Sequence, residues 1–593
     1  MSKVLEIESM LTPDNLGTEI AEKYITWDTF RQTKLTDWDE TRRYIFATDT
    51  TQTSNSKLPW KNKTTIPKLC QIRDNLKANY VAALFPKRQW LFWEGENKAS
   101  EESKKKRAIE QYMGWVVDHP QFKKEVAKMV EDYIDTGNAF ATVEWVDERN
   151  EVQTTTGIKT QYGYVGPMPK RISPLDIVFN PTASAFLQSP KIIRSIMSLG
   201  EVFSYLQSIT TDMNREHLEA LKTYMLELRS NVRDGGADFT EKDAYLRVDG
   251  FTSFREYLQS NYCELLTFYG DLFDVWTGTL YKNHVITVVD RHKVLSCEPQ
   301  PSYFGYPPIY HTGWRTRQDN LWAMGPLDNL VGMQYRIDHL ENLKADVFDL
   351  ITFPPLKIKG FVEDFEWGPM ERIVMDADGD VEMMAPPFNV LTVDNEIAYL
   401  EEKMEIMAGA PKEAMGFRNP GEKTMYEIQR MENAYTRIFQ QKIAQFEEQI
   451  LEPLLNSMLE LAWRKQQGPI TIRVFNDEFE VAEFKNLTPE DITGAGRLKP
   501  LAARHFGEKA ERLQNLQNTY ATFGQDQAIM VHFSGLKIAQ MLEEFMDIED
   551  YGIVQPYIRI AEQADMQRQM DSAQMAVQTE SMTPSGVTAD DLS

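Results

Sequence analysis

The stretch PLDNLVGMQYRIDHLENLKADVFDLI, residues 326–351, decides the fold because it predicts one long amphipathic helix. Its apolar residues recur three and four positions apart, as one buried face of a helix requires. They are Leu327, Leu330, Met333 or Gln334, Ile337, Leu340, Leu343 and Val347. Pro354 and Pro355 end the pattern, since proline cannot continue a helix. At 1.5 Å for each residue, a helix of about 25 residues would be roughly 37 Å long.

A short β segment and a second helix are predicted after it. The segment ERIVMDADGDVEMM contains three alternating acids, Asp376, Asp378 and Asp380. An EF-hand calcium loop needs glycine at its sixth position and glutamate at its twelfth, and here these are Val381 and Pro387. We therefore interpret Asp378-Gly379 as the turn of a β-hairpin. The next stretch, VDNEIAYLEEKMEIMAG at 393–409, predicts the second helix.

The loop GFRNPGEKT, residues 416–424, is close to a phosphate-binding P-loop but does not match it. Glu422 separates the second glycine from the Lys-Thr pair, and no buried strand precedes the loop. Its end instead starts a helix, because Thr424 and Glu427 have the spacing of a capping box. That helix is predicted to reach about Arg464, with a kink at Pro453. We interpret 416–424 as a loop between two helices.

The first half of the chain predicts a mixed α+β body. Helical patterns cover 16–38 and 67–85, and Gly137 ends another helix before the strand AFATVEW. Strand-like segments continue to about residue 181 and return between 262 and 298, on either side of a helical stretch at 200–228. The elements do not alternate as a βαβ series would, so the predicted class is α+β.

Charge is the unusual bulk property. The 593 residues include 64 Lys and Arg against 89 Asp and Glu, a formal net charge of −25. Proteins that grip nucleic acid are normally basic, because their cations replace counterions on the phosphates. The three separated cysteines have no metal-binding spacing, the N-terminal stretch has no signal-peptide pattern, and no apolar run would span a bilayer. We expect a soluble intracellular protein.

Searches for catalytic motifs favour a protein that is not an enzyme. The chain has no H-E-x-x-H motif and no G-x-S-x-G motif. Its eight histidines are scattered, and His311 and His339 stand in contexts where structural roles are expected. We predict no catalytic residues, no metal site and no cofactor.

The order of these elements resembles the portal, or head–tail connector, proteins of tailed bacteriophages, especially the short-tailed ones. DTGNAFATVEW and ISPLDIVFNPTA resemble the portal body, called the wing, and GPLDNLVGMQYRIDHLENLKAD resembles the first stem helix. Residues 396–464 resemble the second stem helix, the tunnel loop and the long helix behind it. LTPEDITGAGRLKPLAARHFGEKAERLQNL resembles the segment that leads to the helical crown. The similarity covers roughly residues 20–570.

The resemblance implies a portal fold with an α/β wing, two long stem helices that flank a small β-containing clip, and a helical C-terminal crown. In numbers it implies a wing at 1–325, stem helix 1 at 326–351, a clip at 352–392, stem helix 2 at 393–410, a tunnel loop at 411–424, a long helix with the base of the wing and crown at 425–500, a crown at 501–578 and a disordered tail at 579–593.

The resemblance also implies a function and partners. Portals are homododecamer rings at one capsid vertex, through which double-stranded DNA is packaged, retained and ejected without sequence preference. The implied partners are the terminase large subunit, the tail adaptor, the major capsid and scaffolding proteins and the internal ejection proteins, with no membrane. The implied location is the virion, at the head–tail junction, after synthesis in the host cytoplasm.

Two sets of residues follow as candidates. The tunnel loop would present Lys412, Gly416, Arg418, Pro420, Gly421, Glu422 and Lys423 to the DNA. Its cations would contact phosphates transiently, or would pair with Glu413, Glu422 or a neighbouring subunit. The acidic stem and clip residues are Asp338, Glu341, Asp346, Asp376, Asp378 and Asp380. Negative walls of this kind would let DNA slide.

Two alternatives remain open at this stage. One is another virion assembly component, an adaptor or scaffold-like protein that encloses no DNA. The other is the packaging NTPase, which would need the intact Walker motifs that this chain lacks.

Overall fold

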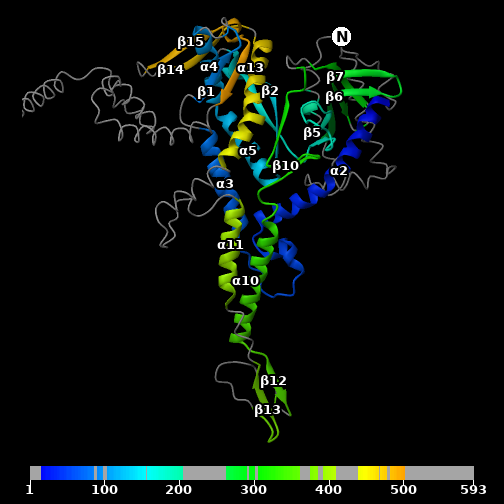
Figure 1. Cartoon of the computed structure of the whole chain (residues 1–593), viewed down its shortest axis with the longest axis vertical. Helices are drawn as coiled ribbons and strands as arrows, with labels where there is room; N and C mark the ends of the chain where they lie inside the picture. Colours follow the sequence, from blue (N-terminus) through cyan, green and yellow to red (C-terminus); the bar gives the residue numbers. More distant parts are fainter. Residues whose placement is uncertain are drawn as a thin grey trace, which may run out of the picture. The chain divides into compact units, whose positions relative to one another are not determined.

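The computed structural model describes residues 15–85, 90–97, 100, 103–154, 157–198, 200–202, 204, 262–289, 291, 293–300, 305–360, 363, 374–384, 392–408, 439–466, 468–476 and 481–500. The predicted tunnel loop (411–424), crown (501–578) and tail (579–593) lie outside these residues, as does most of the helical stretch predicted at 200–228. The described part is a mixed α+β structure (Figure 1).

The helices of the described part are α2 (Asn15–Phe46), α3 (Lys68–Leu84), α4 (Ser103–Val117), α5 (Pro120–Asp135), α10 (Val331–Thr352), α11 (Asp394–Ala408), α13 (Glu452–Lys465) and α14 (Pro489–Ile492), with the 3-10 turns η1 (Thr50–Gln52) and η2 (Ser54–Lys57) and the π turn η5 (Glu447–Leu451).

The strands are β1 (Leu91–Gly95), β2 (Asn138–Thr154), β3 (Gly157–Ile172), β4 (Ile177–Phe179), β5 (Lys191–Ser198), β6 (Tyr262–Asp274), β7 (Thr279–Val289), β8 (Lys293–Pro299), β9 (Ile309–Gly313), β10 (Arg315–Arg317), β11 (Asn320–Met324), β12 (Leu356–Lys359), β13 (Asp380–Met383), β14 (Ile470–Asn476), β15 (Val481–Leu487) and β16 (Gly496–Pro500). The larger sheets have the orders β3-β2-β9 and β4-β5-β6-β7-β8, and their strands pair antiparallel. The α+β prediction is therefore confirmed.

Around Phe140 the sheet β3-β2-β9 is buried on both faces, and its side chains there alternate between two cores. Ala139 and Ala141 of β2 belong to the large core shared with α3, α4, α5 and α13, whereas Phe140 between them belongs to a second core with Trp38 and Trp322. This alternation follows from the two-residue period of a strand. A third core lies between the five-stranded sheet and the start of α2.

Gly137 joins α5 to β2 as the sequence predicts. Its φ of +73° is one that other residues rarely adopt, and a side chain there would collide with the backbone of Gly325. Glycine is therefore required twice over, for the turn and for the close approach of the segment that precedes α10.

Pro453 lies within the predicted long helix, and a π turn precedes it. Residues 439–446 are helical, η5 follows, and α13 begins at Glu452 with the proline in its first turn. Proline has no N–H with which to continue the ladder of a regular helix, and a π turn is one way of admitting it. We predicted a kink at this residue, and the structure has a π turn directly before it.

Candidate functional site

The candidate site is the unit formed by α10, β12, β13 and α11, which we call the stem unit. Helices α10 and α11 pack side by side (Figure 1), and Ile337, Leu340, Ile397 and Met404 are buried in the same core. Lys344 of α10 forms an ion pair with Asp394 at the start of α11 at 2.7 Å, so the two helices run antiparallel. Helix α10 begins at Val331, five residues later than the pattern predicts, because 326–330 form turns.

The hairpin at the end of α10 differs from the predicted one in its pairing. The turn exists, since Gly379 N–H donates to Asp376 O at 2.9 Å. The strand after it, β13, pairs with β12, in the register Leu356↔Met383 to Lys359↔Asp380. We expected a hairpin closed on itself at Asp378-Gly379, but the described partner of β13 precedes the turn by some twenty residues.

The stem unit exposes many apolar side chains. More than half of the exposed large apolar residues in the described part of the chain lie on its four elements or on the segments that connect them, although these residues are a small fraction of that part. They are Tyr335, Phe348, Leu350, Phe353, Ile358, Val374, Met375, Met383, Met384, Tyr399 and Met407. Single exposed apolar side chains are normal on soluble proteins, whereas many of them on one small unit indicate a surface that another molecule covers.

One face of α10 is polar and is bound by the chain itself. Residues 60–66, which we call the strap, connect η2 to α3 and lie along α10. Four α10 side chains spaced four apart form hydrogen bonds with it; we call them the ladder, and they are Gln334, which donates to Ile66 O, and Asp338, Asn342 and Asp346, which accept from strap N–H groups. Two of the predicted acidic stem residues thus belong to an internal contact.

Asp338 is fully buried within the ladder. Its Oδ1 accepts from Ile66 N at 3.0 Å and from Gln334 Nε2 at 2.9 Å, and its Oδ2 accepts from Thr65 Oγ1 at 3.0 Å. Burial raises the pKa of Asp338 to about 6, because desolvation of the carboxylate outweighs these hydrogen bonds, which lower it. In this chain Asp338 faces no solvent.

Asp346 is held differently. It accepts hydrogen bonds from Lys61 N at 3.0 Å and from Asn62 N at 2.9 Å, and Asn62 Nδ2 adds a third. Partial burial acts to raise the pKa of Asp346, but the bonds from Asn62 and Lys61 outweigh it and leave the pKa below its ordinary value.

The remaining acidic candidates are near the surface. Glu341 forms an ion pair with Lys344 at 2.9 Å. Asp376, Asp378 and Asp380 are exposed beside the turn before β13. These three carboxylates are therefore the candidates that point to solvent.

A buried ion pair fixes α11 to the body. Lys68, at the start of α3, contacts Glu405 of α11 at 2.6 Å, and the two side chains are 6% and 3% exposed. Glu401 lies 4.0 Å from the same ammonium group. No local pattern in the sequence indicates this contact, because the two residues are far apart in the chain.

The tunnel-loop candidates lie outside the described residues. This applies to Lys412, Gly416, Arg418, Pro420, Gly421, Glu422 and Lys423. Their proposed contacts with DNA therefore remain predictions.

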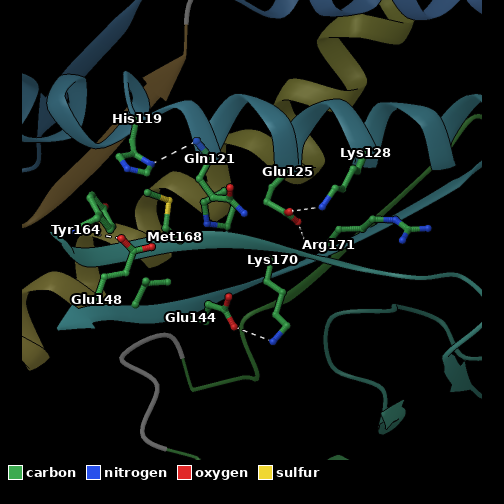
Figure 2. Close-up of a pocket in the computed structure, with 12 residues that line it drawn as sticks. His119, Gln121, Glu125, Lys128, Glu144, Glu148, Tyr164, Met168, Lys170 and Arg171 are labelled. Atoms are coloured by element: carbon green, nitrogen blue, oxygen red, sulfur yellow. Dashed lines mark hydrogen bonds and ion pairs between the residues drawn. The ribbon is translucent and has the colours of Figure 1, made fainter. Parts of the chain in front are cut away.

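The structure also has a groove of about 470 Å³ over β2, β3 and the start of α5 (Figure 2). Its charged groups bind one another: Lys128 pairs with Glu125 at 2.6 Å, and Lys170 pairs with Glu144 at 2.7 Å. His119 accepts from Gln121 N at 3.3 Å and packs against the Tyr164 ring with centroids 4.5 Å apart. We assign no ligand to the groove.

The two singled-out histidines have structural contacts. His311 is packed among Phe140, Phe179 and Phe186, with its Nε2 3.1 Å from Asn138 Oδ1, and burial lowers its pKa to about 3. His339 Nδ1 accepts from Trp60 Nε1 at 3.1 Å. The residues missed by sequence reasoning include Lys191, whose pKa burial lowers to about 7 and whose ammonium donates to Phe186 O at 2.9 Å.

Comparison with known proteins adds no name to this site. No family model matches the chain, and no curated protein matches it. Among the described helices, none is both long and apolar enough to cross a membrane. The described residues also contain no cluster of His, Cys, Asp and Glu that could hold a metal ion.

Proposed function

We propose that this chain is the subunit of a ring-shaped portal that encloses double-stranded DNA at one vertex of a bacteriophage capsid. In this assignment the body is the wing, α10 and α11 are the stem helices, and β12 and β13 belong to the clip. The order of these elements in the sequence motivates the proposal, and the surface of the stem unit supports it physically.

The observation that carries the proposal is the apolar surface of the stem unit. Phe348 is 48% exposed and Phe353 is 63% exposed, and both lie where α10 leads into β12. Burial of apolar surface between two molecules stabilises their association by about 25 cal/mol for each Å² removed from water. Copies of the same chain that pack stem against stem would bury this surface. A head-to-tail contact that repeats around an axis gives a ring when its rotation closes after a whole number of copies.

The charge of the chain supports a channel for DNA. A ring of about twelve copies at −25 each would carry a formal charge of about −300. Phosphates would find few cations to displace their counterions, so DNA would pass without being captured. The exposed carboxylates Asp376, Asp378 and Asp380 suit a clip that repels phosphates. Asp338, in contrast, is buried and takes no part in such a wall in our proposal.

The partners in this proposal follow from the same assignment. The clip would meet the terminase large subunit during packaging and the tail adaptor afterwards. The wing and crown would meet the major capsid, scaffolding and ejection proteins. Lys412, Arg418 and Lys423 would contact the DNA backbone transiently from the tunnel loop, without reading its sequence.

The direct test is the mass and shape of the assembled protein. Light scattering of the purified chain, with negative-stain images of the same sample, should give a closed ring of about twelve subunits around a central hole. A stable dimer or an open filament would overturn the proposal in favour of an adaptor or scaffold-like protein. ATP hydrolysis by the purified chain would also overturn it, since a portal relies on a separate motor.

A further inference from the structure

The strap and the ladder have matching repeats. Along the strap, the N–H groups of Asn62, Thr64 and Ile66 bind Asp346, Asn342 and Asp338 in turn, at 2.9, 2.8 and 3.0 Å. Two residues of extended chain span about 6.6 Å, and four residues of helix rise about 6.0 Å. The near-equality of these lengths lets successive rungs bind alternate residues of the strap. One face of this helix therefore binds an extended backbone over about three turns.

The strap joins the body to α10. It follows α2 and η2 in the chain and leads directly into α3, and Thr50 N–H in η1 donates to Lys63 O at 3.0 Å. At its far end Leu69 N–H donates to Gln334 Oε1 at 3.0 Å. Movement of α10 along its own axis relative to the body must therefore break the rungs.

The rungs are chemically unequal. Gln334 and Asn342 are neutral, and Asp346 receives three bonds close to solvent. Asp338 is a carboxyl group at zero exposure, and no cation contacts it within the described part of the chain. A buried carboxylate without a cation is unfavourable, since only hydrogen bonds replace its hydration.

The neutral acid fits the same place. When Oδ2 carries a proton, it can donate to Thr65 Oγ1, which is 3.0 Å away and can accept as well as donate. Oδ1 keeps both of its donors, Ile66 N–H and Gln334 Nε2. Protonation therefore removes the cost of the buried charge and preserves every hydrogen bond of the rung.

We propose that the strap and ladder form a latch between the body and α10, which closes more tightly when Asp338 gains a proton. The latch is a conformational device beyond the channel function, and it does not depend on ring assembly. It resists movement of the stem helix more strongly in mildly acidic surroundings than in alkaline ones.

The direction of the pH effect follows from linkage. The pKa of Asp338 is about 6 in the closed latch and near its ordinary value of 3.8 once the carboxyl is solvated. The closed form then binds more protons between these values, so it is favoured as the pH falls through 6. The equilibrium constant for opening should rise about 10-fold from pH 5 to pH 8.

Other titratable groups near the latch act differently. Tyr44 of α2 faces Asp338, but burial raises its pKa, so it stays neutral in this range. Lys68 at the start of α3 is bound to Glu405. The pKa of His339 is lowered by burial and by Arg336, and its protonation would remove the bond from Trp60. That effect opposes the one from Asp338 and is common to every variant tested below.

Hydrogen–deuterium exchange of the full-length protein tests the proposal at the amides of the strap. Electron-transfer fragmentation in the mass spectrometer separates Ile66 from Asn62. After correction for the intrinsic pH dependence of exchange, the protection of Ile66 should fall about 10-fold between pH 5 and pH 8. Constant protection, or protection that rises with pH, would overturn the proposal.

A matched pair of substitutions on the same helix face separates the latch from a merely structural role. Asp338→Asn supplies a neutral group that can donate to Thr65 and accept from Ile66, so Ile66 should exchange more slowly than in the wild type at pH 8 and lose the Asp338-dependent pH response. Asp346→Asn exchanges an acceptor of Lys61 N–H for a donor, so the strap should exchange faster at every pH. Faster exchange of Ile66 in Asp338→Asn at pH 8 would show that the carboxylate is the tighter form, and the proposal would fail.

Discussion

Helices α5 and α10 are both long and both largely buried on one side, but they bury different kinds of side chain. Most of the buried residues of α5 are apolar: Phe122, Val126, Met129, Val130, Tyr133 and Ile134, with Asp132 the exception. Half of the buried residues of α10 are polar: Gln334, Asp338 and Asn342, beside Ile337, Leu340 and Val347. On α10 the chain buries polar side chains and leaves several large apolar side chains exposed to water.

The difference shows which helix is fully covered by contacts within its own chain. The contacts of α5 are complete within the body, since its apolar face meets α3, β2 and β3. The contacts of α10 are complete along the strap and along its seam with α11, whereas Phe348 and Leu350 near its end are 48% and 42% exposed. We infer that the body is stable as a single chain and that the end of the stem is completed by other copies.

The largest expected effect is on assembly. Phe348→Glu together with Phe353→Glu places two carboxylates in the apolar surface that we propose packs between copies. Each would lose hydration without gaining a partner, so association should weaken about 100-fold or more, which is about 3 kcal/mol. Sedimentation velocity should show dissociated chains at concentrations where the wild type forms rings.

Phe484→Glu is the matched control for that variant. Phe484 is 73% exposed on β15, outside the stem unit, so the same substitution there should leave the rings intact. Intact rings in the double variant, or equal loss in the control, would show that the stem is not the main contact between copies.

The next effect contrasts two phenylalanines within one chain. Phe122 of α5 has no exposed surface and packs against Phe85, so Phe122→Ala should lower the free energy of unfolding of the body by about 4 kcal/mol. Phe348→Ala should change it by less than about 1 kcal/mol, since the ring is already half in water. Urea denaturation at concentrations below assembly measures both. Similar losses would mean that α10 is as fully packed as α5.

A third effect concerns the buried pair Lys68 and Glu405. Lys68→Met leaves Glu405 buried without its ammonium partner, and this should cost about 3 kcal/mol. The double variant Lys68→Met/Glu405→Met removes both charges and should recover most of the loss. A thermal unfolding series of the four proteins completes the double-mutant cycle. No recovery in the double variant would mean that another contact of the Lys68 ammonium group, such as its 3.1 Å hydrogen bond to Gln71 Oε1, accounts for the loss in place of the ion pair.

Regular elements of the fold were predictable because their signals are local. The apolar periodicity located α3, α10 and α11 to within about five residues, and it placed the start of α2 correctly but its end eight residues too early. Gly137 marked the end of α5. The partner of β13 was not predictable in the same way. The sequence of a turn predicts that the two segments on either side of it pair. The described partner of β13 is instead β12, which lies some twenty residues before the turn.

The site was predictable only in composition. The acids of α10 are visible in the sequence, but their burial is not, because Asp338 and Asp346 face a strap more than 270 residues earlier. A polar stripe at four-residue spacing, Gln334, Asp338, Asn342 and Asp346, was the available signal. Such a stripe on the buried side of a helix indicates a partner with hydrogen bonds to offer. The apolar periodicity uses neighbouring positions of the same helix, such as Ile337 and Leu340, and therefore does not reveal the polar stripe.

The smallest effect concerns the surface pair that also joins α10 to α11. Arg336 lies 3.3 Å from Glu396, and their side chains are 47% and 50% exposed. Water and salt screen a pair of this kind, so Arg336→Ala should cost less than about 1 kcal/mol, and the cost should shrink as salt is added. Thermal unfolding at low and high salt measures it beside Lys68→Met, whose larger cost should persist in salt because that pair is buried. A large, salt-sensitive loss in Arg336→Ala would mean that charges at the surface, and not the seam of Ile337, Leu340, Ile397 and Met404, hold the two helices together.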